Sequence, residues 1–252
     1  MKELLNKIHH ADCLEFMKQL PDKCVDLILC DLPYGITGCS WDSVIPFEDL
    51  WEQYNRIIKD KSAIILTASQ PFTTKLISSN YKSFKFCWYW QKSKGANIGT
   101  TSFMPLKIIE DICIFGKGKL KYNPQKNKLV KPRIADFRSS KNNKSDSVTI
   151  DKDLNIVKTY DESTPINLIY ASTDGDGRIH PTQKPVKLFE YLILTYSNEG
   201  DIVLDNCSGS GTTALACHNT DRQFICIEKD ADYWKASCER LTQHQKQLRL
   251  AV

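Results

Sequence analysis

Two short stretches of this chain bring together residue types that can do chemistry. The first, Asp31-Leu32-Pro33-Tyr34-Gly35, follows the apolar run 24–30 and offers a carboxylate, a proline and an aromatic ring. Proline fixes φ, so the carbonyl groups beside it point in defined directions. A carboxylate next to such a carbonyl is a pair of hydrogen-bond acceptors. The alternative is a strand that runs into an ordinary turn, which this stretch alone does not exclude.

The second stretch is a glycine-rich turn between two predicted strands, 201–206 and 223–228. Gly209 and Gly211 would let a ligand approach the backbone closely, and the helix that follows would present free N–H groups. Glu228, at the end of the second strand, could accept hydrogen bonds from two ribose hydroxyls. The pattern predicts a nucleotide-like ligand, although it lacks the third glycine of a dinucleotide site and the Gly-Lys-Thr of a P-loop.

The elements that must position these stretches alternate along much of the chain. Strands are predicted at 8–11, 24–30, 62–68, 84–91, 108–115, 167–172, 201–206 and 223–228, and helices at 14–20, 47–58, 72–79, 182–195, 214–219 and from 231 onward. Thr182 would cap the helix that has Pro185 in its first turn. This alternation predicts an α/β fold with a mostly parallel sheet and helices on its faces.

Composition excludes several classes of protein. No stretch of about 18 apolar residues is present, so we expect no membrane span, and residues 1–7 lack the apolar core of a signal peptide. The ten cysteines show no spacing typical of a metal site. We therefore expect a cytoplasmic protein with free thiols and no metal.

Positive charge is concentrated in one segment. Residues 117–146 contain ten Lys or Arg and two Asp, whereas the whole chain has a net charge of only +4. This asymmetry suggests a polyanionic partner, and the alternative that charge alone does not exclude is a solvated, partly disordered loop. Residues 116–164 also show no sustained periodicity, which predicts either a small inserted subdomain or a segment that becomes ordered on binding. The candidate phosphate contacts are Lys117, Lys119, Lys121, Lys126, Lys128, Lys131, Arg133, Arg138, Lys141 and Lys144.

Three motifs, in their order along the chain, resemble the β-class amino-methyltransferases of DNA. They are Asp31-Leu32-Pro33-Tyr34, the segment 180–185 (His-Pro-Thr-Gln-Lys-Pro) and the glycine-rich turn 204–213. In that family the catalytic motif comes first, the target-recognition region next and the cofactor motif last. Leu32 replaces the first proline of the usual catalytic motif, and Asp205-Asn206-Cys207 replaces the usual Asp-Pro-Phe. Neither change removes a group that the chemistry needs.

The resemblance implies a fold, a division of the chain and a reaction. The fold is a Rossmann-like class I methyltransferase domain with a circularly permuted motif order. Residues 1–92 would form its catalytic half, 93–177 the basic target-recognition insert and 178–252 its cofactor-binding half. The reaction is transfer of a methyl group from S-adenosylmethionine to a base flipped out of double-stranded DNA. Dimers are common in the family, so a homodimer is compatible with the resemblance.

The resemblance also assigns roles to single residues. Asp31, Leu32, Pro33 and Tyr34 would be catalytic: the Asp31 carboxylate and a neighbouring backbone carbonyl would each accept one N–H bond from the base amine, and Tyr34 would stack on the base. Asp12 and Cys13 would contact the cofactor adenine, Glu228 its ribose, and Lys184 with the turn its methionine part. The full cofactor set is Asp12, Cys13, Asp31, His180, Thr182, Lys184, Asp205, Asn206, Cys207, Ser208, Gly209, Ser210, Gly211, Thr212, Thr213 and Glu228. Alternatively, Asp12 is a helix cap, Glu228 a surface acid and His180 a loop histidine.

The target base is predicted from position 31. Cytosine-N4 enzymes of the family usually have serine there, so Asp31 favours adenine N6. The chain has no Pro-Cys dipeptide, which argues against methylation of a cytosine ring carbon. The alternatives are a cytosine-N4 enzyme, a methyltransferase acting on RNA or a protein amide, and a non-catalytic nucleic-acid-binding protein on the same fold. A nicotinamide oxidoreductase is disfavoured by the missing third glycine.

Overall fold

The computed structural model describes residues 1–35, 42–96, 99, 101–136, 157–172, 177, 179, 180 and 182–250. The chain forms two compact units. The larger unit comprises Met1–Asn123 and Asn167–Val252, and the smaller unit comprises Pro124–Ile166.

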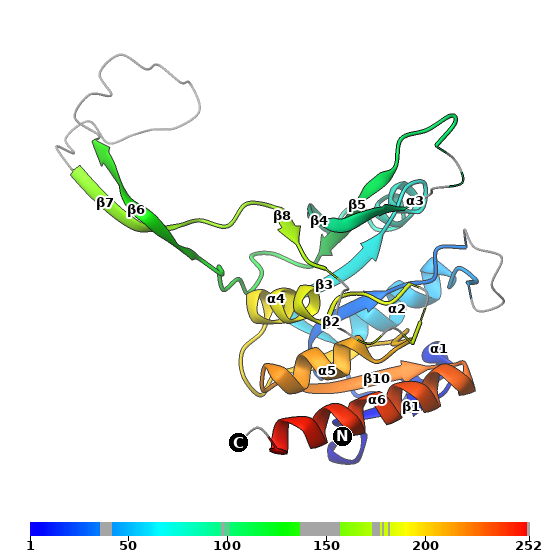
Figure 1. Cartoon of the computed structure of the whole chain (residues 1–252). Helices are drawn as coiled ribbons and strands as arrows, with labels where there is room; N and C mark the ends of the chain where they lie inside the picture. Colours follow the sequence, from blue (N-terminus) through cyan, green and yellow to red (C-terminus); the bar gives the residue numbers. More distant parts are fainter. Residues whose placement is uncertain are drawn as a thin grey trace. The chain divides into compact units, whose positions relative to one another are not determined.

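A sheet of eight strands forms the centre of the larger unit (Figure 1), in the order β1-β10-β9-β2-β3-β5-β4-β8. Its strands are β1 (Lys7–His10), β2 (Val25–Asp31), β3 (Ile58–Ala68), β4 (Phe84–Ala96), β5 (Lys107–Phe115), β8 (Leu168–Tyr170), β9 (Ile202–Asp205) and β10 (Gln223–Glu228). β5 runs antiparallel to β3 and β4, and every other neighbouring pair is parallel. The predicted α/β fold with a mostly parallel sheet is confirmed.

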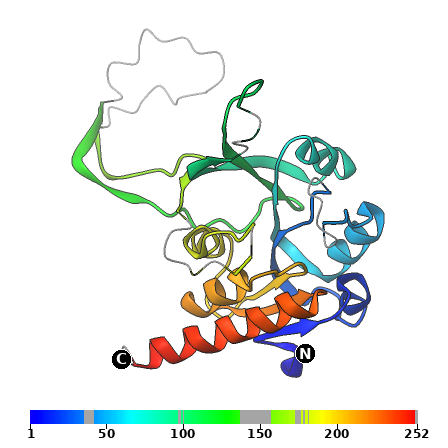
Figure 2. The same cartoon turned by 45° about the vertical axis from the view of Figure 1, so that its right-hand side comes forward.

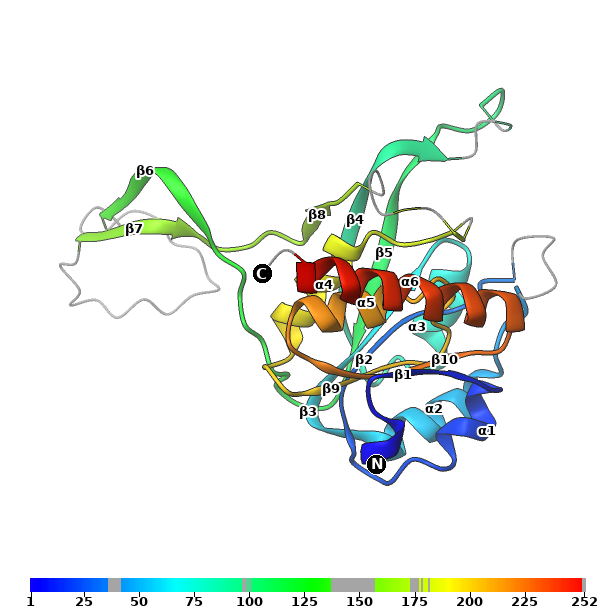
Figure 3. The ribbon, with the colours of Figure 1, turned by 60° about the horizontal axis from the view of Figure 1, so that its bottom comes forward.

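Helices cover both faces of this sheet. They are α1 (Cys13–Met17), α2 (Phe47–Ile57), α3 (Phe72–Ser79), α4 (Val186–Tyr196), α5 (Thr212–Asn219) and α6 (Ala231–Leu250), after a 3-10 turn, η1 (Lys2–Leu4). Alternate side chains of a strand point to opposite faces. Leu27 and Leu29 of β2 therefore pack with α4, α5 and α6, whereas Ile28 and Cys30 pack with α1, α2 and α3. The two layers are distinguished by colour in Figure 2, and Figure 3 shows α4, α5 and α6 together.

Burial on both faces explains why the central strands are continuous apolar runs and do not alternate with polar residues. Because both faces are buried, polar functional side chains are best accommodated at the ends of these strands. Strands β1, β10, β9 and β2 lie side by side in this order, and each runs parallel to the next. Their carboxyl ends therefore meet at one edge of the sheet. β2 ends at Asp31, β9 at Asp205 and β10 at Glu228. An α/β sheet binds ligands at this edge.

The start of α4 differs from the prediction. Pro185 is the N-cap and the helix begins at Val186, so the prediction that Thr182 caps this helix is wrong. The Thr182 hydroxyl instead lies 3.0 Å from Nδ1 of His180. Thr182 therefore belongs to the loop that carries His180 over the carboxyl edge, one turn before the helix starts.

The smaller unit contains two antiparallel strands, β6 (Asn127–Asp136) and β7 (Val157–Ser163), which we did not predict. Val130 and Ile134 are exposed on β6, so the described part of this hairpin has no buried face that would impose a hydrophobic period on the sequence. Within the predicted insert 93–177, β5 and β8 belong to the main sheet, and only 124–166 forms a separate unit. None of the helices in the described ranges combines the length and apolar character needed to cross a membrane.

Candidate active site

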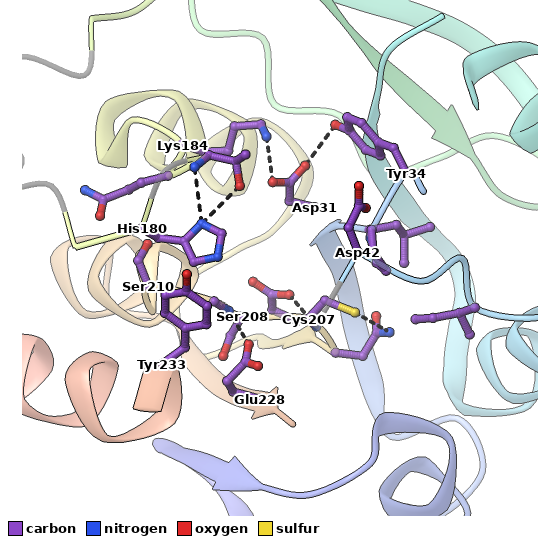
Figure 4. A pocket seen from close by; sticks show the side chains of 18 of the residues that line it. Asp31, Tyr34, Asp42, His180, Lys184, Cys207, Ser208, Ser210, Glu228 and Tyr233 are labelled. Carbon is purple, nitrogen blue, oxygen red and sulfur yellow. Dashed lines mark hydrogen bonds and ion pairs between the residues drawn. The ribbon is translucent and has the colours of Figure 1, made fainter. Parts of the chain in front are cut away.

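A cavity of about 830 Å³ opens at the carboxyl edge of the sheet in the larger unit, and Figure 4 shows part of its lining. Nearly all predicted site residues line it: Asp12, Cys13, Asp31, Leu32, Pro33, Tyr34, His180, Thr182, Lys184, Asp205, Asn206, Cys207, Ser208, Gly209, Ser210, Thr212 and Glu228. Gly211 and Thr213 are not part of the lining. The structure therefore brings the three motifs together, although about 145 residues separate the first from the second.

The Asp31 carboxylate, at the end of β2, is held by three side-chain donors. Oδ1 accepts hydrogen bonds from the Tyr34 hydroxyl, at 2.9 Å, and from the Thr67 hydroxyl on β3. Oδ2 accepts a bond from Nζ of Lys184, at 2.6 Å. A carboxylate has about four lone-pair sites. Three are occupied, so Oδ2 retains one site that can accept another N–H group.

Lys184 lies between two carboxylates. Its Nζ atom is 2.6 Å from Asp31 and 3.8 Å from Oε2 of Glu110, and its side chain is 6% exposed. Burial lowers the pKa of Lys184, but the neighbouring Asp31 and Glu110 raise it by more, and the net shift is upward. Lys184 therefore stays charged. From the sequence we expected Lys184 to contact the cofactor's methionine part, whereas in the structure its ammonium group binds the Asp31 carboxylate.

Glu110, on β5, is a site residue that we did not predict. It is buried and lines the cavity, and its Oε2 atom has no hydrogen-bond partner among the described residues. Oε1 lies 3.4 Å from Nζ of Lys92 on β4. A signal was present in the sequence, since Glu110 and Asp111 interrupt an otherwise apolar strand. A charge in such a position is rarely buried without a partner.

Tyr34 combines a polar and an aromatic contact. Its ring stacks on Phe72 at 5.0 Å, and its hydroxyl bonds Asp31 and Thr67. Burial raises the pKa of Tyr34 well above its ordinary value, and the charges of Asp31 and Glu110 raise it further. The hydroxyl therefore remains a neutral donor to Asp31. Stacking of Tyr34 on a base stays a prediction.

The glycine-rich turn after β9 is tied to the end of β10. The backbone N–H of Gly209 donates to Oε2 of Glu228 at 2.7 Å, and the N–H of Asp230 donates to Oε1 at 2.8 Å. Gly211, the N-cap of α5, has φ +75°, a left-handed conformation that side chains rarely adopt. A Cβ atom there would also lie 3.1 Å from Cβ of Ser237 on α6. Glycine at 211 thus permits both the turn and the packing of α6.

Asp205 lies beneath this turn, with only 3% of its surface exposed. Its carboxylate accepts bonds from the Thr213 hydroxyl and from the N–H of Cys207, the latter at 3.1 Å. Burial raises the pKa of Asp205 to about 7, although the bonds from Thr213 and Cys207 favour the charged form. The group supports the turn from below and borders the cavity.

His180 and Tyr233 cover the turn from the other side. Their ring centroids are 4.2 Å apart, and Nδ1 of His180 accepts from the N–H of Thr182 at 3.2 Å, so the ring proton of a neutral His180 lies on Nε2. Cδ2 of His180 lies 3.9 Å from the place where a Cβ on Gly209 would be. Beside them, the buried hydroxyl of Ser208 has no hydrogen-bond partner among the described residues. Tyr233, on α6, was not predicted.

The helix-cap alternative for Asp12 is also observed. Its Oδ1 accepts from the N–H of Leu14, at 3.0 Å, and its Oδ2 bonds Nζ of Lys229, also at 3.0 Å. Asp12 nevertheless lines the cavity together with Cys13. Asn206 is fixed by the Tyr54 hydroxyl, which donates to its Oδ1. The side chains of Asp12 and Asn206 therefore border the cavity but already have hydrogen-bond partners within the protein.

The ten predicted phosphate contacts are divided between the two units and residues that the structure does not describe. Lys117, Lys119 and Lys121 belong to the larger unit, and Lys126, Lys128, Lys131 and Arg133 belong to the smaller one. Arg138, Lys141 and Lys144 lie outside the described residues. Lys121 is paired with Asp201 and Lys126 with Glu162, whereas Lys128 and Lys131 are exposed on β6.

Comparison with known proteins gives a family for this arrangement. The family model described as "DNA methylase" matches residues 25–239. The matched region includes the end of β2, the loop 180–184, the glycine-rich turn and Glu228.

Individual relatives extend the match over nearly the whole chain. Type II methyltransferase M.HpaI of Haemophilus parainfluenzae is 26% identical over 250 residues, which cover 92% of this chain and 72% of that protein. DNA adenine methyltransferase YhdJ of Escherichia coli (strain K12) is 28% identical over 255 residues, covering 93% of this chain and 82% of that protein. The crystal structure of an M1.HpyAVI–SAM complex has a similar fold, with a TM-score of 0.61 and 22% identity over 93% of this chain and 98% of that chain.

Proposed function

We propose, from the premise that this chain belongs to the DNA methylase family, that it transfers a methyl group from S-adenosylmethionine to the N6 amine of adenine in DNA. The family match confirms the predicted resemblance to amino-methyltransferases of DNA. The observation that carries the proposal is the Asp31 carboxylate, held at the cavity by Tyr34, Thr67 and Lys184 with one acceptor site left on Oδ2.

That acceptor site suits the chemistry of an exocyclic amine. The nitrogen lone pair of such an amine is delocalised into the base ring, which makes the amine a weak nucleophile. An N–H bond to Oδ2 of Asp31 and a second N–H bond to a backbone carbonyl at Leu32–Pro33 would localise the lone pair. Acceptors fixed in advance favour the transition state over the ground state. Tyr34, Thr67 and Lys184 fix Asp31, so the carboxylate need not reorganise during the reaction.

The residues around the glycine-rich turn fit S-adenosylmethionine. The Ser208 hydroxyl is buried without a partner, and Gly209 leaves the space beneath the His180 ring open. The first turn of α5 begins at a glycine that has no side chain to cap its N–H groups, which can bind a carboxylate. Glu228 can receive the ribose hydroxyls. When bound, the cofactor supplies a methyl group already activated on a sulfonium ion, so the protein must chiefly hold amine and methyl in line.

Adenine is the base that Asp31 favours, and YhdJ, a relative named as a DNA adenine methyltransferase, supports this choice. M.HpaI, a relative named as a Type II methyltransferase, favours a role for this chain in a restriction-modification system. The target adenine would be flipped out of duplex DNA into the cavity. Lys128, Lys131 and Arg133, with the other predicted basic residues, would contact phosphates. A cytoplasmic location, a homodimer and independence from metal stay predictions.

Nucleoside mass spectrometry tests this proposal. Unmethylated DNA is incubated with S-adenosylmethionine and protein, then digested to nucleosides. We expect N6-methyladenine from the wild type, and a loss of at least about 100-fold in Asp31→Ala, because an acceptor aimed at the transition state is removed. Asp60→Ala is the matched control, since Asp60 is an exposed acid paired with Lys23.

The other outcomes are equally specific. N4-methylcytosine in place of N6-methyladenine would overturn the choice of base and keep the mechanism. Equal activity in Asp31→Ala and the wild type would overturn the role of the carboxylate. Methylation of RNA alone, or cofactor binding without any methylated nucleoside, would favour the RNA enzyme or the non-catalytic binding protein.

A further inference from the structure

The loop that joins β4 to β5 exposes apolar side chains next to the cavity. Phe103 is 74% exposed, Met104 43% and Leu106 49%. Single exposed apolar residues are normal on a protein surface. Two large apolar residues in succession on a turn are different, because apolar surface that gathers in one place marks an interaction site.

This loop starts and ends at the rim of the cavity. Ala96 of β4 pairs with Lys107 of β5, and both residues line the cavity. Figures 1 and 3 show the β4–β5 hairpin projecting beyond the rest of the sheet. At its neck, Leu106 packs so closely on Gly95 that a Cβ there would lie 2.8 Å from Cβ of Leu106. Leu106 thus closes the hairpin, and Phe103 and Met104 lie in the turn beyond it, which we call the tip.

The surroundings of the tip favour DNA as its partner. Lys94 is exposed on the strand that leads into the loop, and Lys107 follows the loop at the cavity rim. Cations that flank an apolar tip match a duplex, in which charged phosphates flank an apolar stack of bases. Lys107 is four residue steps along the chain from Phe103, a reach of at most about 14 Å. This is comparable to the major-groove width of about 12 Å.

We propose that Phe103, with Met104 beside it, enters the duplex and fills the space that the target base leaves when it moves into the cavity. The inference rests on the proposed function, because it requires a flipped base. Phe and Met are among the apolar residues that proteins insert between base steps. Flipping breaks the stacking of the target with both neighbours, and an apolar ring in the vacated space replaces part of that contact. The tip would therefore assist extrusion of the base and take no part in methyl transfer itself.

The test uses the full chain and two duplexes built on the methylated sequence, once sequencing of methylated DNA has located it. In one duplex the target base is paired. In the other it stands opposite an abasic site, where it is already unpaired and its extrusion is easier. We expect Phe103→Ala to lower the single-turnover methylation rate about tenfold or more on the paired duplex, and to stay within about twofold of the wild type on the abasic duplex. Tyr81→Ala is the matched control, because Tyr81 is also 74% exposed and does not line the cavity.

Each other outcome overturns the proposal. An equal loss on both duplexes would make Phe103 an ordinary DNA contact, and no loss on either would leave the tip without a role in flipping. A change of oligomeric state in Phe103→Ala, with both rates unchanged, would assign the tip to a second copy of the chain. Failure of the proposed function itself is distinguishable, because the wild type would then methylate neither duplex.

Discussion

The carboxylate site at the end of β2 and the glycine-rich turn after β9 line the same cavity, but they are assembled differently. Asp31 meets Thr67 across 36 residues of sequence and Lys184 across 153. In the turn, Asp205 meets Cys207 and Thr213 over two and eight residues, and Gly209 meets Glu228 over nineteen. One region depends on side chains from distant elements, and the other on backbone geometry within a single strand–turn–helix–strand unit.

This difference predicts how each region fails. A charged network that spans several elements is broken by the loss of one member, because the remaining charges stay buried. A turn held by backbone groups keeps its shape when a side chain is changed, so substitutions there should alter a binding constant or a titration with little effect on the chemical step. Three substitutions test this contrast.

Lys184→Met should have the largest effect. The substitution leaves Asp31 and Glu110 without the cation between them, and loss of one partner of a buried ion pair costs about 3–5 kcal/mol of unfolding free energy. We also expect kcat to fall about 100- to 1,000-fold, because Oδ2 of Asp31, the proposed acceptor of the base amine, loses the ammonium group that fixes it. Urea unfolding and single-turnover methylation at saturating S-adenosylmethionine measure the two effects.

Two further variants make this test specific. Lys187→Met is the control, since Lys187 lies only three residues after Lys184, in the first turn of α4, and is 82% exposed and paired with Glu190. Adding Glu110→Gln to Lys184→Met should restore part of the lost stability, because one of the two carboxylates that faced the lost ammonium group is then neutral. If Lys184→Met instead weakened cofactor binding and left kcat unchanged, the lysine would belong to the site of the cofactor's methionine part. The carboxylate site and the glycine-rich turn would then not differ in the way proposed here.

Asp205→Asn should show an effect on the pH dependence of stability. An unfolded aspartate has a pKa of about 3.9, and in the folded protein the pKa of Asp205 is raised to about 7. The folded state therefore binds this proton more tightly, and the stability that it contributes is complete below about pH 4 and is lost as the pH rises to 7. The loss amounts to about 4 kcal/mol over this range. Asp205→Asn has no such proton.

Urea midpoints of the wild type and Asp205→Asn, measured from pH 4.5 to 7.5, check this sign. The variant should gain stability relative to the wild type as the pH rises, and the difference should level off above pH 7. Subtracting the two curves removes the contribution of the other carboxylates. Parallel curves would mean that Thr213 and Cys207 hold Asp205 ionised throughout, so that the turn does not depend on protonation.

The same contrast explains what the sequence could predict. The glycine-rich turn and Glu228 lie in one continuous segment, so their spacing alone placed the turn between two strands and an acid at the end of the second. Asp31 and Lys184 were both identified, but not their contact, because ion pairing across 153 residues depends on the tertiary fold. Thr67 and Glu110 belong to no sequence motif. They reach the site only because β3 and β5 lie near β2 in the folded sheet, and the sequence pattern does not specify that strand order. β6 and β7 were missed because their exposed apolar residues leave no period to detect.

Glu228→Gln should have the smallest effect. The amide keeps an oxygen that can accept the Gly209 N–H, so the turn should remain formed, but it loses the charge that would strengthen hydrogen bonds to ribose hydroxyls. We expect the Kd for S-adenosylmethionine to rise about tenfold, equivalent to about 1.4 kcal/mol, while the methylation rate at saturating cofactor stays within about twofold. Calorimetric titration and single-turnover kinetics separate the two, with the exposed Glu239→Gln on α6 as control. An unchanged Kd with a reduced rate would place Glu228 in the chemical step, and the two regions would then no longer differ in the way their geometry indicates.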